Sequence, residues 1–179
     1  LLRARFVRFG SLSDIDEAVD LLREAIPAAR PETRHLIVSN LADTLAFRGY
    51  RFQRAADLTE AVRLAEATLE ENRPYDRGGL LTNAGLAALE LYRLTDEPGQ
   101  VRNAVSMLAA AIDQYTPAVE LSARLGNLSK ARRLAFAASA DLDDLNAAVA
   151  IARESLRHAS QVRDEVQAAV ELARALWAR

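Results

Sequence analysis

The stretch Ser13–Ile26, SDIDEAVDLLREAI, contains a pattern that returns three more times in the 179-residue chain. Its adjacent residues Ala18 and Val19 recur, at steps of 43, 43 and 44 residues, as Ala61–Val62, Ala104–Val105 and Ala148–Val149. A constant interval over four copies is typical of a repeat architecture. We therefore predict one domain, spanning residues 1–179, built of about four similar units.

A second series of positions keeps the same interval. Asn40, Asn83 and Asn127 are 43 and 44 residues apart, and Glu171 holds the next slot. Seven and eight residues after each repeated alanine come a small residue and a large aliphatic one, which share one face of a helix with 3.6 residues per turn. Together, the two series predict two helices per unit.

Proline and glycine predict where these helices break, at Pro27, Pro31, Pro74, Gly78–Gly79 and Pro98–Gly99. Thr116–Pro117 is typical of an N-cap followed by proline at the first helical position. We predict helices and no strands, at residues 1–9, 14–27, 33–52, 57–72, 77–95, 100–115, 117–139, 143–158 and 162–179. Stacked helix pairs bury one another's apolar faces. The predicted fold is an all-α, α-α superhelix, and a compact up-and-down bundle is the competing architecture.

The segments Leu2–Ile26 and Ser39–Leu69 resemble the long tetratricopeptide-like (TPR-like) repeats of bacterial, especially actinobacterial, proteins. In those proteins the repeats often precede a caspase-like CHAT peptidase domain. The resemblance implies a TPR-like solenoid used for protein contacts. It implies a CHAT peptidase only as a neighbour, because that domain needs a catalytic cysteine and this sequence has none. The later units depart from the pattern at Asp96–Gly99 and Ala138–Leu142, which replace the usual glycine-containing turn.

Composition excludes several classes of function. The 25 acidic and 23 basic residues nearly cancel, so we expect no general attraction to nucleic acid or to an anionic membrane. The absence of cysteine excludes thiol chemistry, and no apolar run approaches the roughly 18 residues of a membrane span. The cytoplasm is the default location. The two histidines, His35 and His158, lie in non-adjacent units, and we predict no enzyme activity and no cofactor.

The acidic clusters near Asp14 and at Asp141–Asp144 raise the question of a metal site. A calcium-binding EF-hand loop starting at Asp141 would need glycine and glutamate where the sequence has Asn146 and Ala152. We instead interpret the first aspartate of each cluster as a helix N-cap and the following acids as partners of the helix dipole. No metal site is predicted.

The repeated asparagines are the best candidates for a binding function, because asparagine inside a helix costs about half a kcal/mol against alanine. On a concave face their amides would pair with the backbone of an extended peptide. Alternatively, each amide bonds a neighbouring helix and holds the units in register. Positions three or seven residues beyond each asparagine share its face, Leu86 and Leu134 among them. The predicted site for a peptide or protein partner is Asn40, Asp43, Phe47, Asn83, Glu90, Arg124, Asn127 and Lys130.

The repeat register places both ends of the sequence inside a helix, since Leu1 matches Thr44 and Trp177 precedes the end by two residues. Arrays need polar caps, so we expect a fragment of a longer solenoid whose uncapped apolar ends self-associate. This suggests a second hypothesis for function, a structural or self-associating spacer that positions an effector domain such as a CHAT peptidase.

Overall fold

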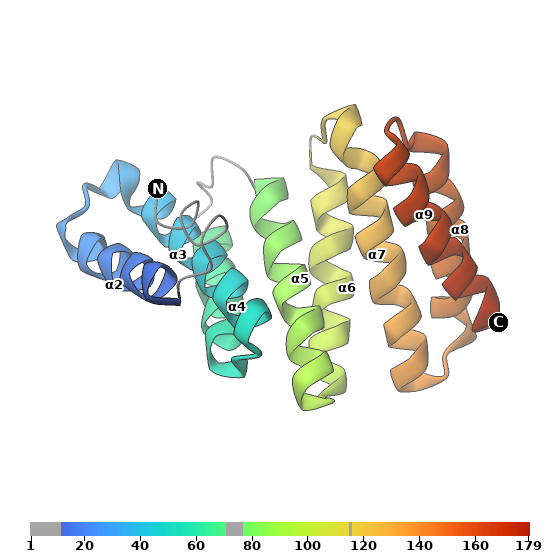
Figure 1. The fold of residues 1–179 in the computed structure, drawn as a ribbon, viewed down its shortest axis with the longest axis horizontal. Helices are drawn as coiled ribbons and strands as arrows, with labels where there is room; N and C mark the ends of the chain where they lie inside the picture. The colour runs from blue at the N-terminus through green and yellow to red at the C-terminus, as the bar shows by residue number, and fades with distance from the viewer. Residues whose placement is uncertain (1–11, 71–76, 115) are drawn as a thin grey trace.

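The computed structural model describes residues 12–70, 77–114 and 116–179, and these residues form helices without any strand (Figure 1). The predicted helix at residues 1–9 lies outside the described part of the chain. The helices are α2 (Leu12–Ala28), α3 (Pro31–Phe52), α4 (Ala55–Glu70), α5 (Arg77–Thr95), α6 (Pro98–Asp113), α7 (Ala118–Ser139), α8 (Leu142–His158) and α9 (Val162–Trp177). Their bounds agree with the predicted ones within two residues at each end.

One predicted helix break was wrong, because Pro98 occupies the first turn of α6. Gly78 lies in the first turn of α5 and Pro27 in the last turn of α2, as the predicted ranges 77–95 and 14–27 have them. A proline is tolerated in the first turn because the N–H groups there have no partner within the helix. The predicted Thr116 cap was also wrong, since Pro117 is the N-cap residue and the Thr116 hydroxyl donates to the Gln114 carbonyl at 3.0 Å.

Three helices end on a residue in the left-handed conformation, and none of these residues is glycine. They are Gln53, Asp96 and Ala140, with φ of 54°, 57° and 59° after α3, α5 and α7. The Asp96 N–H donates to the Tyr92 carbonyl at 2.7 Å, which closes a left-handed C-cap. The three residues follow the repeat interval, so the same turn joins α3 to α4, α5 to α6 and α7 to α8 without a glycine.

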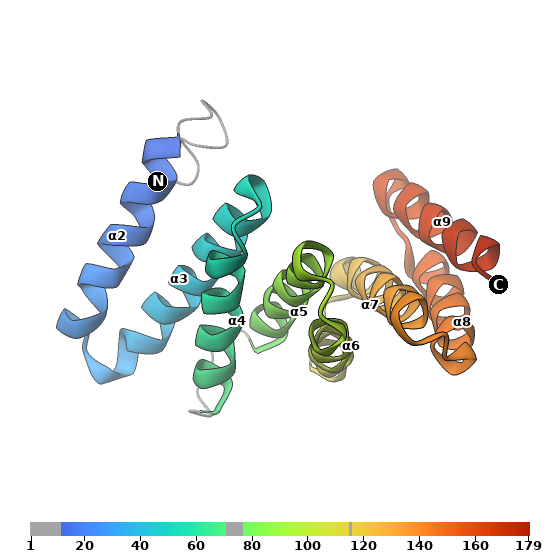
Figure 2. The same cartoon turned by 90° about the horizontal axis from the view of Figure 1, so that it is seen from below.

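The helices form two layers. Contacts join α3 to α5, α5 to α7 and α7 to α9, whereas no comparable contacts join α2, α4, α6 and α8 to one another. Figure 2 shows α5, α7 and α9 on one side of the arc and α6 and α8 on the other. We call α3, α5, α7 and α9 the inner layer and the others the outer layer. Because the inner helices touch and the outer ones are spread apart, the inner layer forms the concave face of an α-α superhelix.

The repeated alanines mark the packing between the layers. Ala61, Ala104 and Ala148 are buried, while Ala18 is half-buried. Small residues on the inner helices let the layers approach closely, and a Cβ added at Gly85 on α5 would lie 2.6 Å from Cγ of Leu108 on α6. The 43- to 44-residue period of the alanines therefore marks the positions where the outer helices pack against the inner ones.

Candidate functional site

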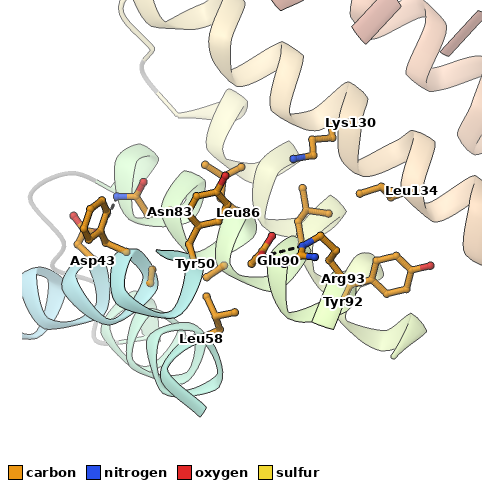
Figure 3. Close-up of a pocket in the computed structure, with 14 residues that line it drawn as sticks. Asp43, Tyr50, Leu58, Asn83, Leu86, Glu90, Tyr92, Arg93, Lys130 and Leu134 are labelled. Atoms are coloured by element: carbon orange, nitrogen blue, oxygen red, sulfur yellow. Dashed lines mark hydrogen bonds and ion pairs between the residues drawn. The ribbon is translucent and has the colours of Figure 1, made fainter. Parts of the chain in front are cut away.

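A cavity of about 500 Å³ opens on the concave face, between α3, α5 and α7 (Figure 3). Among the inner helices that the structure describes, it lies where successive helices separate, because α5 and α7 contact one another far less than α3 and α5 or α7 and α9 do. Figure 3 places Asp43 and Tyr50 of α3 on one side and Lys130 and Leu134 of α7 on the other. The lining residues are Asp43, Ala46, Phe47, Tyr50, Leu58, Asn83, Leu86, Ala87, Leu89, Glu90, Tyr92, Arg93, Lys130 and Leu134.

Five of the eight predicted site residues line this cavity, drawn from three units of the array: Asp43, Phe47, Asn83, Glu90 and Lys130. Leu86 and Leu134, which share their faces, line it as well. Residues three and seven positions beyond the asparagines therefore come together in space.

The asparagines themselves do not form a continuous ladder. Asn40 is exposed and Asn127 is half-buried, and neither lines the cavity. Asn83 does, and its Nδ2 donates to Oδ1 of Asp43 at 2.7 Å, which links α5 to α3. The side-chain amides of Asn40 and Asn127 form no hydrogen bond with other described residues. Asn83 therefore connects neighbouring units, as one of the two alternatives expects, and it also lines the cavity.

Arg124 has a structural role that the sequence pattern did not indicate. Its side chain is buried, and Nη1 donates to the Ala111 carbonyl at 2.9 Å and to the Thr116 hydroxyl at 3.1 Å. Its Nη2 donates to Glu120 at 2.8 Å. Arg124 therefore holds the connection between α6 and α7 and does not line the cavity, contrary to its predicted position on the concave face. A residue three positions before Asn127 is rotated toward α6, on the edge of the predicted face.

Sequence reasoning missed three lining side chains with functional groups, Tyr50, Tyr92 and Arg93. The spacing of the correctly placed residues contained the signal for Tyr50 and Arg93. Positions 40, 43 and 47 are followed by 50 at the next step of three, and positions 83, 86 and 90 are followed by 93. Alternating steps of three and four stay on one helix face, so one further step along each helix would have found both residues.

The ionic groups of the cavity differ in how far they are already paired. Arg93 donates to Oε1 of Glu90 from Nε at 2.9 Å and from Nη2 at 2.6 Å. Hydrogen bonding to Glu90, and then the charge of Glu90, raise the pKa of Arg93 above its ordinary value. Asp43 accepts the Asn83 hydrogen bond. Lys130 is exposed and forms no ion pair with any described residue, whereas Glu90 is paired with Arg93.

The acidic clusters have structural partners. Asp141 caps α8 as predicted, accepting the Asp143 N–H at 3.0 Å, and Asp144 pairs with Arg132 at 2.6 Å. Asp14 differs from the prediction, because α2 begins at Leu12 and Asp14 lies in its first turn. Within the described ranges, no three His, Cys, Asp or Glu residues are grouped so that they could hold a metal ion. Nor is any described helix both long and apolar enough to cross a bilayer.

Comparisons with known proteins give little guidance. No protein-family model matches the chain, and no curated protein matches it. Among solved structures, the chain is similar to the DHF58 filament, at 15% sequence identity and a TM-score of 0.34, covering 99% of this chain and 87% of that one. A TM-score this low does not establish a shared fold.

Proposed function

We propose that this protein is a cytoplasmic protein-interaction module whose concave cavity between α3, α5 and α7 binds a peptide segment of a partner protein. The observation that carries the proposal is the cavity itself. Its volume of about 500 Å³ falls within the usual range for ligand sites, and its walls combine aliphatic and aromatic side chains with a few polar groups. The TPR-like family resemblance agrees with such a role and stays a prediction.

The apolar lining suits one large apolar side chain of the partner. Leu86, Leu134 and Tyr50 come from three different helices and surround the space that this side chain would fill. Burying about 200 Å² of apolar surface contributes on the order of 5 kcal/mol. Association costs at least a comparable amount, so anchoring by one side chain does not suffice. Contacts on both sides of the anchor are therefore part of the proposal.

The charged residues of the cavity indicate which residues of the partner should flank the apolar anchor. Glu90 is already paired with Arg93, and Asp43 accepts a hydrogen bond from Asn83. Lys130 is exposed and has no ion-pair partner among the lining residues. The partner segment we propose therefore carries aspartate or glutamate within a few residues of its apolar anchor, close enough to reach the Lys130 ammonium.

A phage-displayed library of random linear peptides tests this proposal. Selection on the purified protein should enrich peptides that combine an aromatic or large aliphatic residue with a nearby acid. Lys130→Glu should weaken their binding roughly tenfold, because a favourable charge pair becomes a repulsive one. Leu134→Asp should weaken it further, because a charge would be buried beneath the anchor.

Arg102→Glu is the matched control, since Arg102 is an exposed cation on α6 in the outer layer. Its substitution should leave peptide affinity unchanged. If selection enriches no peptide, or if the enriched peptides bind Lys130→Glu and Leu134→Asp as tightly as the unmodified protein, the groove proposal fails. The spacer hypothesis, in which the array only positions an effector domain such as a CHAT peptidase, would then be the better account.

A further inference from the structure

Two planar side chains line the cavity from neighbouring inner helices. Tyr50 of α3 is 65% exposed, and the Arg93 side chain of α5 is 53% exposed. Figure 3 shows the Tyr50 ring rising from α3 and Arg93 on α5, where a dashed line joins it to Glu90. The pKa of Arg93 is raised first by Glu90, and the phenolate charge of Tyr50 adds to the increase, so Tyr50 and Arg93 lie close together.

The repeat register shows that helix packing requires neither side chain. Tyr50 and Arg93 hold the same position in successive units, and Ala137 of α7 holds it in the next unit. All three residues are exposed, and α7, which has only an alanine there, still packs on α8. A large aromatic ring that stays mostly in water also contributes little hydrophobic stabilisation. Tyr50 and Arg93 are therefore available to contact a bound partner.

Glu90 holds the Arg93 guanidinium in an arrangement that suits stacking. Oε1 of Glu90 accepts hydrogen bonds from Nε and Nη2 of Arg93, at 2.9 and 2.6 Å. Hydrogen bonds from these two atoms leave along the edge of the planar guanidinium, so they do not use its flat faces. Because the ion pair fixes the plane before a partner arrives, little side-chain freedom is lost when a ring packs on it.

We infer that the apolar anchor of the partner is an aromatic side chain, whose ring packs against the Tyr50 ring and the Arg93 guanidinium. This inference rests on the proposed function and specifies the anchor that the cavity selects. Stacking on Tyr50 favours an aromatic anchor over an aliphatic one roughly two- to tenfold, and contact with Arg93 adds a smaller factor. Tyr50 and Arg93 are then specificity-determining residues, while Lys130 binds the flanking acid.

Two peptides that differ only at the anchor test this inference. The tightest peptide from the phage selection is synthesised with phenylalanine and with leucine at its anchor position. Fluorescence anisotropy then measures the dissociation constant of each peptide with the full chain. Burial of phenylalanine and of leucine contributes similar hydrophobic free energy, so the ratio of the two constants measures the stacking. The phenylalanine peptide should bind roughly two- to tenfold more tightly.

Substitutions at the two exposed residues assign the preference to their side chains. Tyr50→Leu removes the ring and keeps an apolar side chain, so it should abolish most of the preference for phenylalanine. Arg93→Lys should reduce the preference by a smaller factor, because lysine can still pair with Glu90 but has no planar face. Each ratio compares two peptides on the same variant, so a general loss of folding or affinity cancels out.

The matched control is Tyr50→Phe, which keeps the ring and removes only the hydroxyl, and it should retain the full preference. A preference that Tyr50→Phe loses would belong to the hydroxyl and would overturn the stacking. If selected peptides bind equally well with phenylalanine and leucine, or if Tyr50→Leu keeps the full preference, the aromatic anchor is wrong while peptide binding itself stands. If selection enriches no peptide, both proposals fail.

Discussion

Two helix pairs, α3 with α4 and α5 with α6, differ in the side chains that they place at the same two repeat positions. One pair has a buried ion pair there, and the other has none. In the first pair, Arg48 donates to both carboxylate oxygens of Asp57, at 2.7 and 2.8 Å, and to Asp16 of α2 at 2.9 Å. Forty-three residues later the same two positions hold Leu91, which is buried, and the half-buried Gln100. The backbone arrangement persists although an ion pair has been exchanged for an aliphatic side chain.

This difference indicates that the repeat does not require a charge at these positions. Burying an ion pair costs desolvation energy that its attraction and hydrogen bonds only offset, and apolar replacements of similar volume are often neutral or stabilising. The third pair differs again, because the smaller Ala135 takes the place of Arg48, and Asp144 pairs instead with Arg132 at 2.6 Å. The units therefore share the arrangement of their helices, and each unit satisfies its polar groups differently.

Replacing Arg48 by leucine should have the largest effect on stability. The change leaves Asp57 buried without its bidentate partner, and breaking a buried pair in this way costs about 3–5 kcal/mol. Urea denaturation of the variant and the unmodified chain measures the loss. The double variant Arg48→Leu/Asp57→Gln copies the α5–α6 solution, and should return to within about 1 kcal/mol of the unmodified chain. A double variant as unstable as the single one would show that the charge itself is required.

Gly85→Ala should have the next largest effect, because the apolar pair depends on close approach. The added Cβ would lie 2.6 Å from Cγ of Leu108, which is buried and has little room to move. We expect a net loss of about 1–2 kcal/mol in urea denaturation, with overpacking exceeding the gain in helix propensity. Gly99→Ala is the control, since an added Cβ there meets nothing within 4 Å and should stabilise the chain slightly. Equal effects at the two glycines would contradict the close-packing argument.

The turns that close the two pairs should respond differently to glycine. Gln53 and Asp96 both have positive φ, a conformation that glycine adopts freely and that aspartate tolerates better than glutamine. Gln53→Gly should therefore raise the free energy of unfolding by about 1 kcal/mol, and Asp96→Gly should raise it by less. Thermal unfolding followed by circular dichroism is sensitive enough to rank them. A loss of stability in Gln53→Gly would show that the Gln53 side chain makes a contact that stabilises the fold more than the relief of backbone strain does.

Raising the pH should have the smallest effect of the four changes on stability, because the Arg48–Asp57 ion pair keeps its charges over the accessible range. Hydrogen bonding to Asp57 raises the pKa of Arg48, and although burial lowers it, the charges of Asp57 and Asp16 add to the increase. Stabilisation from a raised pKa is fully present below the ordinary pKa and is lost only as the pH rises through the raised value. The stability difference between the unmodified chain and Arg48→Leu/Asp57→Gln should therefore stay constant from about pH 7 to about pH 9.5. A difference that shrinks over this interval would mean that the pair titrates.

The helices were predictable because their signals are local. Apolar periodicity and the repeat interval placed all eight described helices within two residues, since both depend on neighbours along the same helix. Capping was less predictable, because a cap depends on the turn that enters the helix; Asp141 was correctly predicted and Thr116 was not. The cavity lining was predicted in part, as far as the prediction followed steps of three and four residues from the asparagines. Tyr50 and Arg93 lie one step beyond the point where that prediction stopped.

By itself, the sequence determined the all-α repeat, its interval and the face on which each helix packs, because side-chain size at a fixed helical spacing specifies these. Only the tertiary structure decided where the inner layer opens. Separation of α5 from α7 is the combined result of packing along the whole array, and it makes a cavity from residues of three units. The same packing buried Arg124 beneath the α6–α7 connection and bonded Asn83 to Asp43 across two units. No local sequence pattern specifies these contacts, because they depend on how each unit is oriented against the next.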